Sequence, residues 1–549
     1  MKKDIMKKRL LLIIIIATTM VSSLNASAQR IGLTYLYAGN TSLYTNNVNH
    51  AGGAISVVCP DYFELYSTGD LKLLSKIDTA LVDNMHQRNI KVMPFLSNHW
   101  DRDLGRAAMK NRTALVAQIV SAVNQYGFDG INIDIENLND ADRNDHTDFI
   151  RLLRESLPKG KILSIAVAAN PYGVYYGWAG SYDYKVLGQL CDTVMIMAYD
   201  EHYYGSEEGP VASSSYAENS LKYALKMIPK EKILLGVPFY GRYWKQGASK
   251  GGSGITSYDV EALINRYNGK VTYDTSTQTA KAVVTIGSND PKPILWGGSV
   301  LSAGTYTIYY DNAQALKYKL QLVQKYDVKG AGSWCLGQES LETWDYFARW
   351  LNGKYFTDIL GHYAQDDILD LTAKGWMIGV SSNSFAPNYT LTRAEAAVIL
   401  VRALGLENET PAEYFSDTLN HGARDMIGIA RKYQIILGDG TNHFWPNNPL
   451  TREQMAMILD RVLVLPKPVT TNPFADISPR TNPLSYDSIM RLAANGIVMG
   501  NGRGAFNPRG IIHRGEMAVF VNRSSAFEMT YPAKRDPSIA SPRNITEPR

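Results

Sequence analysis

The stretch from Phe128 to Asn137, F-D-G-I-N-I-D-I-E-N, constrains the fold of this chain more than any other. Isoleucines alternate in it with residues that carry polar or charged groups. Successive side chains of a β-strand point to opposite faces, so Asn132, Asp134 and Glu136 share one face of the predicted strand. Burying an unpaired polar group costs about 2–7 kcal/mol. We therefore expect the polar face to line a site.

The spacing of the two carboxylates narrows the chemistry. Along one strand, the Cα atoms of Asp134 and Glu136 lie about 6.5 Å apart, so both groups approach a substrate from the same side. They cannot flank a glycosidic bond from opposite faces, as an ordinary acid and nucleophile must. One carboxyl group can donate a proton while the other orients part of the substrate. The alternatives are a polar strand end without chemistry and an Asp/Glu metal site.

The run from Asp129 to Glu136 resembles the signature D-x-x-D-x-D-x-E of family 18 glycoside hydrolases. This resemblance implies that the motif ends the fourth strand of a (β/α)8 barrel. It further implies that Glu136 is the general acid and that Asp134 orients the substrate N-acetyl group, which attacks the anomeric carbon. Asn132 stands where many chitinases have Asp. It can hydrogen-bond Asp134 but cannot take its proton, and the same Asn is usual in a subgroup resembling spore-cortex peptidoglycan N-acetylglucosaminidases.

Eight strand-like runs alternate with helical runs in the first part of the chain. The strand-like runs are Ile31–Tyr37, Ala54–Cys59, Lys91–Leu96, Phe128–Ile135, Ile162–Ala168, Thr193–Tyr199, Ile233–Phe239 and Gly330–Leu336. Many are apolar on both faces, as in a parallel sheet covered by helices. Helices are expected, for example, over Asp70–Arg88, Leu104–Tyr126 and Ala141–Leu157. The pattern predicts an α/β fold, a (β/α)8 TIM barrel over residues 29–353, with a doubly wound open sheet as the alternative.

The alternation breaks after the seventh strand. Lys270–Ile286 has the pattern of a β-hairpin, and Asp311–Tyr326 that of a helix before the last strand. We expect a small α+β insertion over about residues 245–305. Many family 18 enzymes carry such an insertion, which walls one side of the groove.

Other strand ends add candidate site residues, because the chemistry of a (β/α)8 barrel lies at the carboxyl ends of its strands. M-A-Y-D at Met197–Asp200 resembles the family's M-x-Y-D, which implies that the Tyr199 hydroxyl holds the N-acetyl oxygen. G-V-P-F-Y-G-R at Gly236–Arg242 is similar to G-x-P-x-Y-G, and Trp334 would form the floor beneath the sugar. The candidate substrate-binding residues are Asn132, Asp129, Asp200, Met197, Trp334, Tyr240, Arg242, Tyr37 and Asn98. For Tyr37 and Asn98, an ordinary strand-end role is the alternative.

The beginning of the chain has the pattern of a signal peptide over residues 1–28. Lysines precede an apolar run that is too short to span a bilayer, and Ala26-Ser27-Ala28 forms a cleavage site. We therefore expect a secreted protein without a membrane span after signal removal. The net charge of +4 on 549 residues does not indicate nucleic-acid binding. The three cysteines, Cys59, Cys191 and Cys335, are expected to be buried thiols.

A repeat follows Gly353. Phe-x-Asp begins at residues 356, 415 and 474, a constant interval of 59 residues. Each copy continues with a helical run, a Gly-bounded turn, Phe-x-Pro and a second helix. The second helices open with the tetrads T-R-A-E, T-R-E-Q and H-R-G-E, similar to a helix N-cap with a capping-box acid. A fixed period of this kind predicts an all-α repeat domain.

This repeat resembles three S-layer homology modules, over residues 354–410, 411–470 and 471–527, followed by a tail, 528–549, expected to be disordered. The resemblance implies a pseudo-threefold bundle. It also implies that the tetrad arginines, Arg393, Arg452 and Arg514, bind an anionic secondary cell-wall polymer, since arginine grips carboxylates with two parallel bonds. An ordinary helix start with a solvated arginine is the alternative at each site.

The sequence therefore predicts an exported, wall-anchored glycosidase that hydrolyses β-1,4 linkages of N-acetylglucosamine in peptidoglycan, without a metal or other cofactor. Its catalytic residues would be Glu136, Asp134 and Tyr199. Two alternatives stay open. A chitinase would share all of these residues, and a non-catalytic surface carbohydrate-binding protein would keep the barrel but not cut.

Overall fold

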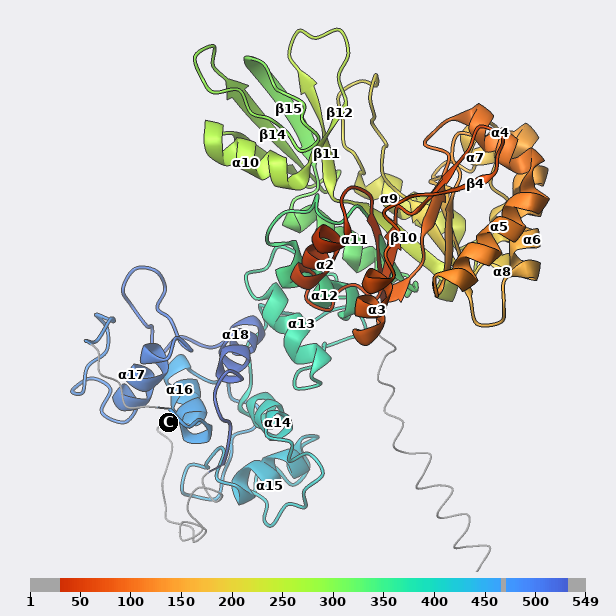
Figure 1. Cartoon of the computed structure of the whole chain (residues 1–549). Coiled ribbons are helices and arrows are strands. Elements are labelled where there is room, and N and C mark those ends of the chain that lie inside the picture. The colour runs from red at the N-terminus through yellow and green to blue at the C-terminus, as the bar shows by residue number, and fades with distance from the viewer. Residues whose placement is uncertain (1–29, 466–470, 532–549) are drawn as a thin grey trace, which may run out of the picture. The chain divides into compact units, whose positions relative to one another are not determined.

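The computed structural model describes residues 30–465 and 471–531 (Figure 1). The chain divides into two compact units, Met1–Asn352 and Gly353–Arg549. The predicted signal peptide lies outside the described residues, as does the predicted tail from residue 532 on. The first residues of that tail are ordered, contrary to expectation: Thr530 N–H donates to Val462 O, and Val464 N–H donates to Glu528 O.

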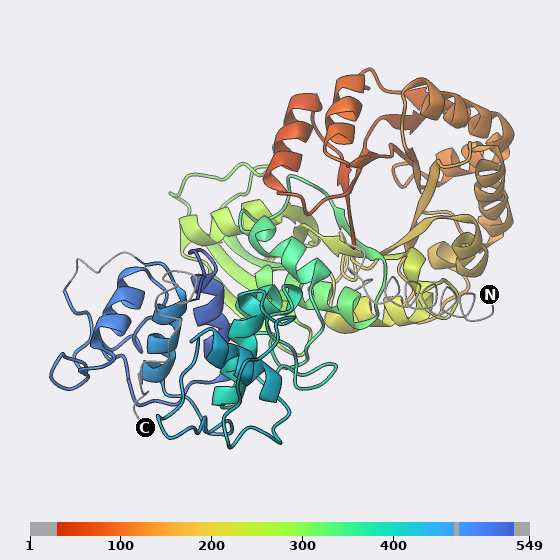
Figure 2. The same cartoon turned by 90° about the horizontal axis from the view of Figure 1, so that it is seen from below.

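The first unit contains the predicted barrel. Its strands are β1 (Ile31–Leu36), β2 (Val57–Pro60), β5 (Lys91–Val92), β6 (Phe95–Ser97), β7 (Gly130–Asp134), β8 (Ile162–Ala168), β9 (Thr193–Met197), β10 (Ile233–Pro238) and β16 (Gly330–Trp334). β5 and β6 form one barrel position, interrupted around Pro94, which has no N–H to donate. On one side of this position, β5 pairs with β2 and β2 pairs with β1. On the other side, β6 pairs with β7, and parallel pairing continues through β8, β9 and β10 to β16, which pairs with β1. The sheet therefore closes on itself (Figure 2). The (β/α)8 prediction is confirmed, and the open sheet is excluded.

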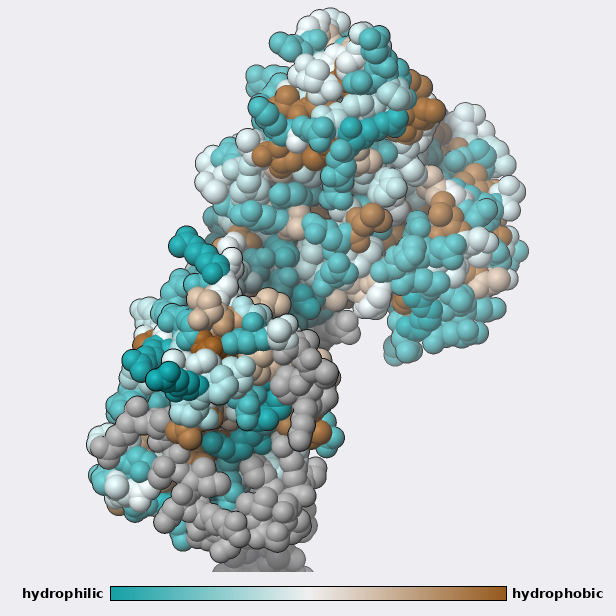
Figure 3. Space-filling view, turned by 90° about the vertical axis from the view of Figure 1, so that its left-hand side faces the viewer, coloured by the Kyte–Doolittle hydropathy of each residue, from teal (hydrophilic) through white to brown (hydrophobic). Residues whose placement is uncertain are grey.

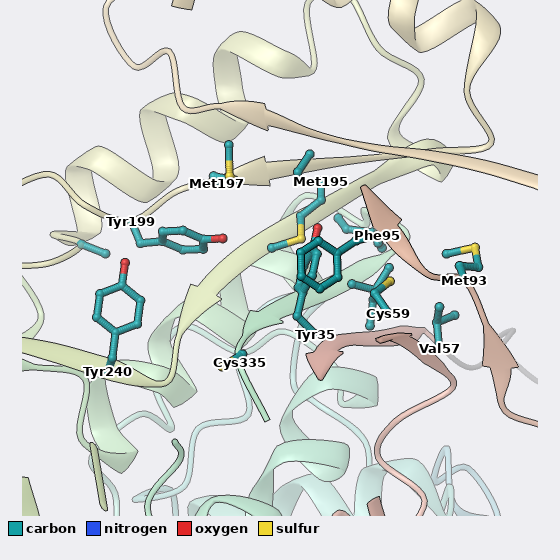
Figure 4. Close-up of a cluster of buried hydrophobic side chains, with 14 of the residues drawn as sticks. Tyr35, Val57, Cys59, Met93, Phe95, Met195, Met197, Tyr199, Tyr240 and Cys335 are labelled. Atoms are coloured by element: carbon teal, nitrogen blue, oxygen red, sulfur yellow. The ribbon is translucent and has the colours of Figure 1, made fainter. Parts of the chain in front are cut away.

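The alternation in β7 sorts its side chains as predicted. Ile131, Ile133 and Ile135 are fully buried on one face, while Asn132 and Asp134 are buried on the other. The barrel interior is filled from neighbouring strands by residues such as Tyr35, Cys59, Phe95 and Met195 (Figure 4). The three cysteines are buried free thiols, as expected. The polar face of β7 therefore points into the barrel, where it can reach a site only at the carboxyl end.

Two predicted helices differ from the structure. Leu71–Leu73 forms β4, which pairs antiparallel with β3 (Phe63–Leu65), and only Thr79–Gln87 is helical, as α3. The Asp78 side chain caps α3 by accepting from Ala80 N–H. The predicted helix Leu104–Tyr126 is divided at Asn111 into α4 (Arg102–Lys110) and α5 (Arg112–Gln125). The side-chain amide of Asn111 donates to Asp70, so this residue serves a tertiary contact at the break.

The insertion forms its own antiparallel sheet, which begins at Tyr240, somewhat earlier than predicted. The strand order is β12-β11-β15-β14-β13, with helix α10 (Ser257–Tyr267) packed against it (Figure 1). The strands are β11 (Tyr240–Lys245), β12 (Ser253–Thr256), β13 (Lys270–Asp274), β14 (Thr279–Ile286) and β15 (Gly304–Tyr310). β13 and β14 are the predicted hairpin, and α11 (Ala313–Lys325) is the predicted helix that returns the chain to β16.

In the part of the second unit that the structure describes, the helices form three pairs. They are α13 (Gln365–Ala373) with α14 (Arg393–Ala403), α15 (Arg424–Lys432) with α16 (Arg452–Val462), and α17 (Tyr486–Ala494) with α18 (Arg514–Ser524). The aspartate of each Phe-x-Asp accepts backbone N–H groups from the Phe-x-Pro turn of its own module, as Asp358 does from Phe385 and Ala386. The repeated residues thus fix each module's turn.

The tetrad arginines join successive modules. Arg393 donates from Nε to Phe444 O at 2.8 Å and from Nη2 to Leu437 O at 2.9 Å, both in the second module. Arg452 makes the same bonds to Phe506 and Met499 of the third module, and Arg514 to Phe385 and Ile378 of the first. Each guanidinium also lies over the phenylalanine ring whose carbonyl it binds. These three inter-module ties close the modules into a ring.

No helix among the described residues is long and apolar enough to cross a membrane. On the face shown in Figure 3, hydrophilic residues predominate and hydrophobic ones form scattered small patches.

Candidate active site

A cavity of about 730 Å³ opens at the carboxyl ends of the barrel strands. Seven predicted site residues line it: Asp134, Glu136, Met197, Tyr199, Asp200, Tyr240 and Arg242. Trp334 is an eighth, and Trp100, Trp178, Tyr203 and Tyr204 complete the lining. A second cavity of about 340 Å³ shares Asp200, Tyr240, Arg242 and Trp334 with the first and reaches Trp296 of the insertion. The cleft therefore continues from the carboxylate pair towards the insertion.

Asp134 is a buried carboxyl group with an unsatisfied oxygen. Its side chain is almost fully buried, and none of the described residues donates a hydrogen bond to Oδ1. Burial raises the pKa of Asp134, because the charged form loses its hydration. An oxygen of this kind, at a cavity wall, costs about 1–3 kcal/mol unless a ligand supplies a donor. The geometry thus prepares Asp134 to meet a polar hydrogen of a bound molecule.

Asn132 is held away from Asp134. Its Oδ1 accepts from the Tyr35 hydroxyl at 3.0 Å, and its Nδ2 donates to Ser164 Oγ at 2.9 Å. Ser164 Oγ also accepts from Thr193 Oγ1 at 2.8 Å. The oxygen and the nitrogen of the amide are thus both hydrogen-bonded within the barrel interior, below the cavity. Asn132 therefore supports the site rather than lining it.

Glu136 follows the end of β7, and its backbone is fixed by Asn98. Asn98 Oδ1 accepts from Glu136 N–H at 2.8 Å, and Nδ2 donates to Glu136 O at 2.9 Å and to Asp101 O at 2.7 Å. Burial, together with the charges of Asp134 and Asp200, raises the pKa of Glu136 well above its usual value. A glutamic acid in these surroundings keeps its proton at pH values where a solvated one has lost it.

Tyr199 and Tyr240 line the cavity together with the carboxyl groups. Their rings pack edge to face, with centroids 6.0 Å apart (Figure 4). Burial, and next the charge of Asp134, raises the pKa of Tyr199, so its hydroxyl stays a donor. Asp200 has a left-handed backbone, with φ of 58°, and its Oδ1 accepts from Arg242 Nη2 at 2.6 Å. Asp200 and Arg242 line both cavities, and their ion pair forms a polar edge of the cleft.

Aromatic side chains form the remaining walls. Trp334 packs against Tyr35 and Tyr37, with ring centroids 5.1 and 5.4 Å away, and forms a floor beside the carboxyl pair. Trp100 and Trp178 pack edge to face at 4.7 Å on another wall. Apolar ring faces with a few polar groups between them are the usual lining of a small-molecule or sugar site.

Besides Asn132, three predicted substrate-binding residues line neither cavity. Asp129 sits at the amino end of β7, where its carboxylate accepts from Val92 N–H, Lys91 and His86; the prediction for it is wrong in position. Asn98 is fully buried beneath Glu136, and Tyr37 backs Trp334 without lining either cavity.

Several residues of the site were not predicted. Trp100, Trp178, Tyr203 and Tyr204 line the cavity, and Tyr182 donates from its hydroxyl to Ile135 O at 2.9 Å, next to Glu136. All five belong to segments that follow strand ends, and this position was the only signal in the sequence. Within the described residues, no three His, Cys, Asp or Glu side chains are grouped to hold a metal ion.

Comparison with known proteins agrees with this geometry. The family model of glycosyl hydrolases family 18 matches residues 34–339, and the S-layer homology domain matches residues 355–397, 414–456 and 473–518. The "Uncharacterized glycosylase YvbX" of Bacillus subtilis is 26% identical over 62% of this chain and 98% of its own length. The "Cortical fragment-lytic enzyme" of the same organism is 24% identical over 48% of the chain, which spans only 61% of that protein.

Among solved structures, a chitinase from Chromobacterium violaceum is similar over 59% of this chain and 98% of its own, with a TM-score of 0.51 and 26% identity. The three S-layer homology domains indicate anchoring at the cell surface. With its barrel, its carboxyl pair at the end of β7 and a family match that spans both, the chain belongs to family 18 of the glycosyl hydrolases.

Proposed function

We propose that this protein is a wall-anchored glycosidase that hydrolyses β-1,4 linkages of N-acetylglucosamine in peptidoglycan by substrate-assisted retaining catalysis. The observation that carries the proposal is the unsatisfied Oδ1 of Asp134, buried at the cavity wall beside Glu136. A 2-acetamido group brings an N–H that fits this acceptor. Its carbonyl oxygen is then left free to act as a nucleophile.

In this mechanism Glu136 donates its proton to the glycosidic oxygen as the bond to the anomeric carbon breaks. Asp134 accepts the acetamido N–H and Tyr199 donates to the acetamido oxygen, so the oxygen attacks the anomeric carbon and an oxazolinium ion forms. Glu136, now a carboxylate, takes a proton from the incoming water. The water attacks the anomeric carbon and opens the oxazolinium ring, so the product keeps the original anomeric configuration. The raised pKa of Glu136 suits the first step, since the acid must be protonated near neutral pH.

Asn132 does not enter this proton path. Its amide is engaged with Tyr35 and Ser164, and an amide cannot accept the proton of Asp134. Asp134 acts as a carboxylate that accepts the acetamido N–H, and its charge helps Glu136 to keep its proton. The proposed role of Asn132 is to hold the polar layer beneath the pair.

Peptidoglycan is the first choice of substrate because of two separate features. A relative of the barrel is called a cortical fragment-lytic enzyme, and the S-layer homology domains bring the chain to the cell surface. The similarity to a chitinase supports chitin oligosaccharides as the second candidate.

Purified full-length protein should release reducing ends from peptidoglycan faster than from chitin oligosaccharides, and Glu136→Gln should abolish both activities while the protein stays folded. Product mass spectrometry identifies the bond that is cut. A Glu136→Gln variant with full activity contradicts the acid assignment. Binding of either glycan by the unaltered protein without any product favours the alternative of a carbohydrate-binding protein.

We also propose that the second unit holds an anionic secondary cell-wall polymer. A cavity of about 370 Å³ in this unit is lined by Arg402, His421 and Arg514, among others. The guanidinium of Arg514 is mostly engaged by carbonyls and by Glu395 at 3.0 Å, and Arg452 lies against Glu516. Arg393, Arg452 and Arg514 would thus shape the polymer grooves mainly by joining the modules, with a smaller direct part in binding.

A further inference from the structure

Five strongly exposed tyrosines lie in two loops at the end of the barrel that carries the catalytic cavity. Tyr172, Tyr175 and Tyr176 lie in the loop that follows β8, and Tyr203 and Tyr204 in the loop that follows β9; their exposed fractions are 79, 67, 73, 56 and 60%. β8 and β9 are neighbouring parallel strands, so both loops leave the barrel side by side at the end that carries the site. Large exposed aromatic surfaces are uncommon on soluble proteins and usually mark an interaction site.

The loop after β8 is held in shape by its own polar groups. Asn170 bridges it from both sides, with Oδ1 accepting from Val174 N–H at 2.7 Å and Nδ2 donating to Val174 O at 2.8 Å. Gly177 N–H donates to Asp140 Oδ1 at 2.8 Å, which fixes the start of α7 (Gly177–Gly180). The loop thus presents its tyrosines on a fixed backbone, and little ordering entropy is lost when a ligand binds.

Residues of the same two loops line the catalytic cavity. Trp178 comes two residues after Tyr176 and lines the cavity, as do Tyr203 and Tyr204 from the neighbouring loop. From Ala169 to Gly180 the sequence A-N-P-Y-G-V-Y-Y-G-W-A-G has no charged residue. Ring faces without charge fit the apolar C–H faces of neutral sugar rings, whereas a loop that recognises a charged polymer needs basic groups.

We propose that Tyr172, Tyr175 and Tyr176 form an accessory glycan-binding surface, the tyrosine platform, which holds the strand of a polymeric acetamido glycan beyond the catalytic cavity. The inference rests on the proposed function for the chemical class of its ligand. The platform acts on long substrates only, because an oligosaccharide that fills the cavity does not reach it.

The test uses the full-length chain with Tyr172, Tyr175 and Tyr176 all replaced by Ala, by Phe, or left unchanged. Each form is made with Glu136 intact and as Glu136→Gln. Binding of the Glu136→Gln forms is measured on chitin beads and on purified peptidoglycan freed of secondary wall polymers, so that the S-layer homology domains do not contribute. Two exposed tyrosines that line neither cavity, Tyr66 and Tyr258, are replaced by Ala as the matched control.

The triple Ala form should bind the preferred polymer about tenfold or more weakly than the parent, because three aromatic contacts with the glycan are lost. The triple Phe form and the control should bind as the parent does. With Glu136 intact, kcat/KM on a soluble acetamido tetrasaccharide should stay within about twofold in all forms, as should the melting temperature within its error.

Two results overturn the platform alone: equal polymer binding by the triple Ala form and the parent, or an equal loss of activity on the tetrasaccharide and the polymer. In both cases a parent that cuts peptidoglycan still supports the proposed function. A parent that neither binds nor cuts either polymer overturns both proposals. If the platform binds a partner protein instead, the triple Ala form retains polymer affinity, which is the first of these results.

Discussion

Replacing Asn98 by Ala should impair catalysis although this side chain does not touch the cavity. The amide is fully buried and makes three hydrogen bonds of 2.7–2.9 Å, two of them to the backbone N–H and O of Glu136. Its removal leaves these two groups buried without their partner, at about 1–3 kcal/mol each, and also opens a small cavity. We expect a loss of about 3 kcal/mol in the free energy of unfolding.

The catalytic effect follows from the freed backbone of Glu136. A displacement of a reacting group by about 1 Å can cost about 100-fold in rate. We therefore expect kcat of Asn98→Ala on peptidoglycan to fall by about 10- to 100-fold. KM should change much less, because the other groups that line the cavity stay in place. The assay combines urea unfolding with steady-state release of reducing ends.

Asn111→Ala is the matched control, since this asparagine also donates from its side chain, to Asp70, but lies at the junction of α4 and α5. It should lower stability without lowering kcat. An Asn98→Ala variant that loses stability but keeps the parent kcat refutes the view that Asn98 positions Glu136. So does a variant in which KM alone changes.

Three further predictions concern other buried groups. The pKa of Glu136 is higher in the folded than in the unfolded chain, so its burial disfavours folding increasingly as the pH rises above the pKa of the unfolded chain. Glu136→Gln should therefore raise the melting temperature at pH 8 more than at pH 4. An equal change at both pH values refutes this prediction. Lys319 and Asp311 form a fully buried ion pair at 2.7 Å. Lys319→Met should lower the free energy of unfolding in urea by about 3–5 kcal/mol, and adding Asp311→Leu should recover most of this loss. Additive losses in the double variant contradict the pairing. Arg514→Ala removes two hydrogen bonds to carbonyls of the first module. It should lower the free energy of unfolding of the second unit by about 2–3 kcal/mol and leave activity on a soluble substrate unchanged. An unaltered free energy of unfolding would show that these bonds are not needed to hold the three modules together.

The barrel and its carboxyl pair could be predicted because their sequence signals are local. Eight apolar runs give eight strands, and the period of two in β7 places Asp134 inside and Ile133 outside. The same rule could have excluded Asp129, whose position in the alternation is opposite to that of Asn132 and Asp134 and which lies at the far end of the strand. The family motif favoured it nonetheless.

What could not be predicted depends on contacts between distant segments. Nothing at the end of the third strand indicates that the amide of Asn98 turns beneath Glu136 instead of into the cavity. Trp100 and Trp178 meet across the site from two separate loops whose local sequences give no sign of pairing. Arg393 has the pattern of an exposed residue in the first turn of a helix, yet it is buried because it reaches carbonyls in the next module.

The closed order of these arginine ties has a consequence for how the anchor can be shortened. The third module supplies Arg514 to the first, so the bond that completes the circle joins the two ends of this part of the sequence. Deleting any single copy leaves one arginine without its receiving turn and one turn without its arginine. A truncated protein with two copies should therefore lose far more than a third of its anchoring strength. We therefore expect all three modules to be needed when this anchor is transferred to another enzyme.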